Sequence, residues 1–102
     1  MFIHTVFFWL RDDLAAHETA QFVDGARSLT TIESVRQGYL GTPASTDREF
    51  IDRSYSYALT AIFSDQAAHD AYQVDPVHDR FRDECAHLWR QVRIYDAVTV
   101  DA

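Results

Sequence analysis

One segment near the start of the chain, FIHTVFFWLR from Phe2 to Arg11, limits the possible folds more than any other. Its β-branched and aromatic residues predict a strand, in which alternate side chains point to opposite faces. Both faces are apolar. The two rows are His4, Val6, Phe8 and Leu10 on one face, and Ile3, Thr5, Phe7 and Trp9 on the other. A strand of this kind needs cover on both sides of its sheet.

The rest of the chain predicts three more strands and two helical regions. Asp12 and Asp13 are candidate N-caps of a helix from near Leu14 to about Ile32, in which Gly25 indicates a close approach to the sheet. Ser64 is the candidate cap of a second helix, whose inward face is expected to consist of Ala67, Ala68, Ala71 and Tyr72. That helix restarts at Asp75-Pro76, which supplies an N-cap and a first-turn proline, and runs to about Trp89. The remaining strands are expected at 35–42, 54–63 and 92–100, with a polar loop at 43–54.

This order of elements is strand, helix, strand, strand, broken helix, strand. It predicts a single α+β domain over residues 1–102, the ferredoxin-like βαββαβ fold with a four-stranded antiparallel sheet and two helices on one face. The helices leave the other face bare, although the first strand has large apolar residues there. The simplest cover is the sheet of a second copy, so we expect a homodimer.

Charge and cysteine content exclude several classes of partner. The formal net charge is −7, from 16 acidic residues against 9 basic ones, which argues against nucleic acids and anionic membranes. The single cysteine excludes an internal disulfide and suits a reducing compartment. There is no basic leader and no apolar run of the ~20 residues that span a bilayer, so a cytoplasmic location is expected.

The polar residues expected to point inward are the candidates for function. Helical-wheel positions place Tyr72 and His78 toward the interior and His69, His87 and the early His17 toward water. His4 is expected to be buried with a partner such as a backbone carbonyl, and Tyr57 points inward if the third strand presents Tyr55, Tyr57 and Leu59. Each inward group is either a satisfied core residue or part of a pocket with an acid–base histidine and a hydrogen-bonding tyrosine.

Other kinds of site have weaker support. Cys85 lies within an apolar helical face, where an inert thiol is expected. A metal site from His4, His78 and a carboxylate has no spacing signature, so we expect neither a metal nor a cofactor.

Three motifs, HxVFFxL at His4 to Leu10, AYxxDPxH at Ala71 to His78 and LWRQVRIYDA at 88–97, resemble the stress-responsive A/B barrel (Dabb) family. The resemblance implies a dimeric α+β barrel. It also extends to a polyketide cyclase of the family, which implies that Tyr72 and His78 are the catalytic pair of an intramolecular aldol condensation. The cyclase has a further pocket histidine where Tyr57 stands and an aliphatic residue where Phe8 stands. The other expected pocket residues are His4, Val6, Phe8, Phe22, Tyr57, Leu59 and Ile94.

Three functional hypotheses follow. The first is a homodimeric protein whose small apolar pocket binds a small hydrophobic or carbonyl-bearing ligand without catalysis. The second is a cyclase-like lyase that uses Tyr72 and His78 for proton transfer. The third is an enzyme like the monooxygenases of related dimeric barrels, for which no dedicated haem-ligand pattern is present.

Overall fold

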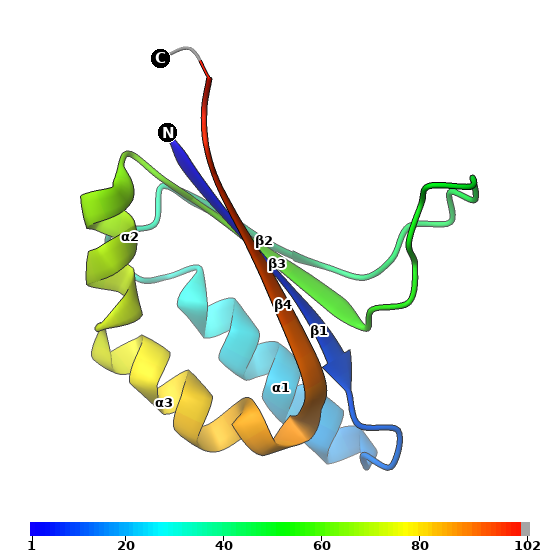
Figure 1. Cartoon of the computed structure of the whole chain (residues 1–102). Coiled ribbons are helices and arrows are strands. Elements are labelled where there is room, and N and C mark those ends of the chain that lie inside the picture. Colours follow the sequence, from blue (N-terminus) through cyan, green and yellow to red (C-terminus); the bar gives the residue numbers. More distant parts are fainter. Residues whose placement is uncertain (101–102) are drawn as a thin grey trace.

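The structure is a computed structural model that describes residues 1–100, and its helices lie on one side of an antiparallel sheet (Figure 1). The strands are β1 (Phe2–Leu10), β2 (Gln37–Gly41), β3 (Tyr57–Phe63) and β4 (Trp89–Val98), in the order β2-β3-β1-β4. The helices are α1 (Ala16–Leu29), α2 (Gln66–Gln73) and α3 (Pro76–Cys85), with a 3₁₀ turn at Ala86–Leu88. The predicted ferredoxin-like α+β fold is therefore confirmed.

Strand β1 lies in the middle of the sheet, between β3 and β4. Its buried row faces the helices and consists of Phe2, His4, Val6, Phe8 and Leu10. The opposite row is half-buried, so Phe7 and Trp9 belong to the face that the helices leave bare. Tyr55 packs edge-on against Phe7 on this open face, with ring centroids 4.9 Å apart, and does not point inward with Tyr57 and Leu59.

Helix α1 packs closely against α3 at Gly25. A Cβ atom at this position would lie 2.7 Å from Sγ of Cys85 and 3.2 Å from the ring of Phe81. The close approach inferred for Gly25 is thus real, but its neighbour is α3 rather than the sheet.

Two of the predicted helix caps are wrong, for local reasons. Asp13 pairs with Arg11 at 2.7 Å, and α1 begins later, after Ala15, whose amide donates to Glu18 at 2.9 Å. Helix α2 is capped by Asp65, one residue after Ser64, through a 2.9 Å bond from the Ala68 amide.

The predicted restart of the helix is confirmed, but its end was placed too late. Asp75 caps α3 by accepting a hydrogen bond from Val77 at 2.8 Å, with Pro76 at the first helical position. Helix α3 ends at Cys85, and β4 already begins at Trp89 because this residue pairs with Leu10 of β1.

The segment between β2 and β3, residues 42–56, extends away from the sheet (Figure 1). Its end is tied to β1, since Ser54 accepts a 3.2 Å hydrogen bond from the Trp9 indole. The long loop predicted at 43–54 is present, but β3 begins only at Tyr57, so the strand start predicted at residue 54 is wrong. Within residues 1–100, none of the helices has the length and apolar character needed to cross a membrane.

Candidate functional site

A cavity of about 300 Å³ lies between the helix-facing side of the sheet and helices α2 and α3. Its walls include seven residues expected from the sequence: His4, Val6, Phe8, Leu59, Tyr72, His78 and Ile94. They also include Leu29, Gln73, Phe81, Arg82, Trp89 and Val92. Phe22 and Tyr57 were expected in this lining but lie outside it. These two rings instead pack against each other, with centroids 5.3 Å apart.

The cavity is open where edge strand β4 has no helix above it. Val92 and Ile94 line the cavity and yet are 40% and 52% exposed. They alternate with Arg93 along β4 and lie directly opposite Phe8 and Val6 of β1. An apolar molecule could therefore enter along β4 without displacing a helix.

The break between α2 and α3 places Tyr72 and His78 next to each other. Tyr72 is in the last turn of α2, and its carbonyl accepts a 3.2 Å hydrogen bond from the Asp75 amide. Because Asp75 then caps α3, His78 falls in the first turn of that helix. The two rings meet edge to face with centroids 5.0 Å apart.

These two side chains do not bond to each other or to any other group in residues 1–100. Tyr72 is 1% exposed. Its hydroxyl group makes no hydrogen bond within residues 1–100. His78 also lacks a partner, and its Nδ1 is buried. A structural hydrogen bond that locks the two helices together, the alternative to a pocket, is therefore not formed within the described part of the chain.

Burial sets the protonation of both groups. Burial lowers the pKa of His78, and the nearby Arg82 guanidinium lowers it further. The imidazole is therefore neutral at pH 7 and can accept a proton. Burial raises the pKa of Tyr72 well above its usual range, so its hydroxyl stays protonated and acts as a hydrogen-bond donor.

His4 is buried and paired, as expected, but its partner is a carboxylate. It is 2% exposed, and its Nδ1 lies 2.5 Å from Oδ1 of Asp96 on the neighbouring strand β4. Burial lowers the pKa of His4, against the opposing effect of Asp96. The register of β1 and β4 places the two residues directly opposite each other.

His69 was expected to face water, and this is wrong. Its side chain is 13% exposed, and its ring stacks on Phe2 with centroids 4.4 Å apart at 27°. The inward face of α2 includes Ala68, His69, Tyr72 and Gln73, at the helical spacings of three and four residues. Ala67 and Ala71 are exposed. The predicted inward face was therefore wrong, because it was oriented by alanine residues that are in part exposed in the structure.

The remaining candidates behave as expected from the sequence. His17 and His87 are exposed. Cys85 is fully buried, and burial raises the pKa of its thiol, with a smaller contribution from Glu84. Its weak contact to the Gln21 carbonyl fits an inert core thiol.

Similar structures come from several organisms. A Dabb family protein with a ferredoxin-like fold from Mesorhizobium loti is 26% identical, with a TM-score of 0.76 over 97% of this chain and 96% of its own. Hydroxynitrile lyase from Passiflora edulis is 18% identical, with a TM-score of 0.79 over 99% and 94%. A dimeric ferredoxin-like protein of unknown function from Thermobifida fusca is 17% identical, with a TM-score of 0.77 over 96% and 90%.

No curated protein matches this chain. The family model described as the Stress Responsive A/B Barrel Domain, Dabb, matches residues 2–99. This match includes every strand and helix of the structure. The chain therefore belongs to the Dabb family.

Proposed function

We propose that this protein is a homodimer that binds a small organic ligand with a carbonyl or carboxylate group in the cavity at the α2–α3 break. The observation that supports this most is Nδ1 of His78, a buried nitrogen at the cavity that has no hydrogen-bond partner within residues 1–100 and lies next to Tyr72. Buried polar atoms nearly always have a hydrogen-bond partner, so an unpaired imidazole nitrogen beside a cavity is suited to a ligand that supplies the missing partner.

The rest of the lining indicates the chemistry of the ligand. Most of the wall is aliphatic or aromatic, and its volume of about 300 Å³ is at the small end of ligand pockets, which span roughly 300–1,000 Å³. Arg82 contributes a guanidinium group, which favours an anionic group on the ligand. These features together favour a small aromatic or ketone-bearing acid.

The binding proposal is tested by thermal unfolding in the presence of aromatic and polyketide-like acids. A ligand that binds only the native state raises the unfolding temperature in a concentration-dependent way. We expect this stabilisation to be lost in His78→Ala and retained in the control His87→Ala, because His87 is exposed and outside the cavity. Equal stabilisation of the two variants would contradict the proposed location.

A second candidate function, proton-transfer catalysis, is favoured by the neutral state of His78. In this reaction the imidazole removes a proton from the carbon next to a carbonyl, and that C–H electron pair moves into the new enolate. The Tyr72 hydroxyl donates a hydrogen bond to the enolate oxygen. The enolate carbon then attacks a second carbonyl of the same molecule, and the protonated His78 returns the proton to the new alkoxide.

The Passiflora edulis hydroxynitrile lyase supports this candidate only in a general way. Its similarity to this chain is one of fold, and proteins that share a fold can catalyse many different reactions. A catalytic His78 would be recognised by turnover of a linear polyketide, which should fall by about 10²–10⁴-fold in His78→Ala. If the wild type binds the ligand but does not turn it over, the catalytic candidate is contradicted and only the binding function remains.

The homodimer is supported by the open face of the sheet. Its half-buried Phe7 and Trp9 border a groove that also includes Tyr55 and the 57% exposed Tyr95. The similar protein from Thermobifida fusca is described as dimeric. Covering this face with a second sheet would bury apolar area that a monomer leaves in water.

Light scattering tests the dimer. The expected mass is twice the 11.8 kDa of one chain, and Trp9→Glu should shift the protein toward monomer because it places a charge in the apolar contact. A folded wild-type monomer at micromolar concentration would contradict the proposal.

The proposal also includes a cytoplasmic location. The one thiol of the chain, Cys85, is buried and free, which suits a reducing compartment.

A further inference from the structure

Two imidazoles and one carboxylate meet at one side of the cavity, which His4 lines. They belong to His4 of β1, His69 of α2 and Asp96 of β4, and one donor atom from each lies within 4.8 Å of the other two. We propose that His4, His69 and Asp96 bind a divalent transition-metal ion, with Zn²⁺ as the best match. Nitrogen and carboxylate oxygen donors in a set of three are typical of zinc sites that keep a position open for water or a ligand.

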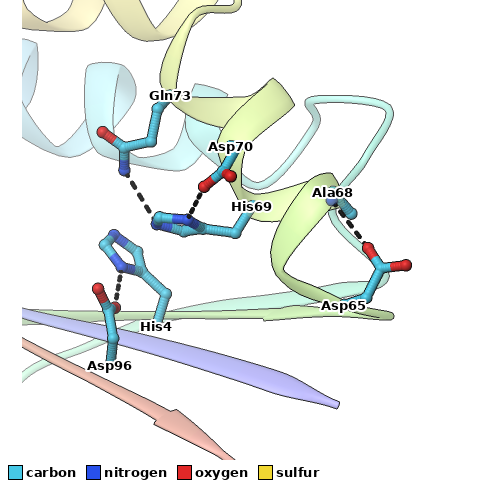
Figure 2. A network of polar contacts seen from close by, with 7 residues as sticks. All are labelled: His4, Asp65, Ala68, His69, Asp70, Gln73 and Asp96. Carbon is cyan, nitrogen blue, oxygen red and sulfur yellow. Dashed lines mark hydrogen bonds and ion pairs between the residues drawn. The ribbon is translucent and has the colours of Figure 1, made fainter.

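The three side chains are held in place by different parts of the fold. His4 is 2% exposed and lies directly opposite Asp96 in the β1–β4 pairing. His69 comes from the other layer, where its ring rests on Phe2. The imidazole centroids of His4 and His69 are 5.0 Å apart, and Figure 2 shows the two rings next to each other above Asp96.

The distances are close to those of a zinc site. Zinc lies about 2.0–2.2 Å from nitrogen and oxygen ligands, so tetrahedral donors are separated by roughly 3.3 Å. Donors that are already within 4.8 Å can reach this separation through small side-chain rotations. Asp96 has the freedom for this, because its side chain is 39% exposed.

A second carboxylate supports the assignment of His69 as a ligand. Oδ1 of Asp70 lies 3.1 Å from Nδ1 of His69, as Figure 2 shows. Metal-binding histidines commonly donate their other ring N–H to a carboxylate, which fixes the tautomer. If Asp70 holds the proton on Nδ1, the lone pair of Nε2 is available, and it now accepts a 3.3 Å hydrogen bond from the Gln73 amide.

A plain ion pair explains less of this arrangement. His4 and Asp96 could satisfy each other, but that pair requires neither the second histidine nor the carboxylate behind it. A metal ion would use all four groups. It would displace the Gln73 amide from His69 or bind the Gln73 carbonyl oxygen after the side chain turns. Both His4 and Gln73 line the cavity, so the open metal position would face it.

The site can be tested on the ligand-free protein, independently of the proposed function. Chain without an affinity tag is treated with EDTA, dialysed and titrated with ZnCl₂ in a calorimeter. We expect one Zn²⁺ per chain, and the matched control His87→Ala should bind with the same affinity. His69→Ala and Asp96→Asn should weaken binding by more than the roughly 10–100-fold that loss of an outer-shell partner typically causes.

Asp70→Asn tests the site with a smaller expected effect on binding. Because the Asp70 side chain is 63% exposed, this variant should fold normally. It should weaken binding by roughly 10–100-fold while circular dichroism stays native. Replacing Zn²⁺ by Co²⁺ should give a visible absorption band that is absent in His69→Ala. The proposal is overturned if the wild type takes up no Zn²⁺, or if His69→Ala and His87→Ala bind it equally.

Discussion

The α1–α3 interface and the α2–α3 junction lie beneath the same sheet but are built in opposite ways. At the first, Gly25 lets the helices approach until a single added carbon would clash with Cys85. At the second, the chain breaks at Asp75, and a cavity remains beside Tyr72 and His78. Close packing stabilises the fold, whereas unpaired polar groups beside a cavity lower stability and suit a ligand. We therefore expect changes at the two regions to separate stability from binding.

The largest effect on stability is expected for Phe22→Ala in the close-packed region. Phe22 is fully buried and has aromatic neighbours at centroid distances of 5.0 Å (Phe8) and 6.1 Å (Phe81). Its loss should lower the free energy of unfolding by about 3–5 kcal/mol. Urea unfolding at a fixed protein concentration measures this change. A loss below about 1 kcal/mol would mean that α1 is not the main source of stability.

Gly25→Ala should have the next largest effect, about 1–3 kcal/mol of destabilisation, because the added methyl group overpacks the interface. Gly41→Ala is the matched control, since a Cβ atom there would meet nothing within 4 Å. The same urea unfolding experiment compares both with the wild type. If the two alanines have equal effects, the approach of α1 to α3 is looser than described.

The pH dependence of stability should reveal the unpaired His78. Burial lowers its pKa in the folded state below the ordinary value of 6.5, so between these two values the unfolded chain binds more protons. Stability due to this group is therefore fully present above pH 6.5 and falls as the pH drops below it. Unfolding in EDTA-containing buffer should show a decline with falling pH that is smaller in His78→Gln. A steeper decline in the variant would indicate that charged His78 has a stabilising partner.

Tyr72→Phe should change stability least. The hydroxyl makes no hydrogen bond within residues 1–100, so the loss should stay below the roughly 0.5–1.5 kcal/mol of a typical hydrogen bond. Ligand-induced stabilisation should nevertheless fall, because the cavity loses the hydroxyl donor that lies next to His78. Thermal unfolding with and without ligand measures both effects. A large loss of stability together with unchanged binding would assign Tyr72 to the core alone.

The sequence predicted the junction better than its surroundings, because the junction is determined locally. Asp75-Pro76 supplies a local helix-start signal, an N-cap followed by a first-turn proline, and the spacing from Pro76 then orients His78. The pairing of His4 with Asp96 joins residues 92 positions apart, and only the register of β1 and β4 defines it. A period-two row of Val92, Ile94 and Asp96 was the available signal.

His69 was missed for a similar reason. It lies three residues before Tyr72, which is a spacing that shares one helical face, but the neighbouring alanines suggested another face. The direction of a short helix is settled by what it rests on, here Phe2 at the end of β1. The prediction of the four-stranded fold was not affected by this error, because the order of strands and helices does not depend on which face of a helix points inward.

The central claim is that ligands bind at the α2–α3 junction and not elsewhere on the sheet. The most direct test is a titration of ¹⁵N-labelled protein with salicylate, followed by amide chemical shifts. We expect the changes to be concentrated at His4 and at residues 72–78, with little change at Phe7 and Trp9 on the open face. Changes confined to the open face, or none at millimolar salicylate, would contradict the account.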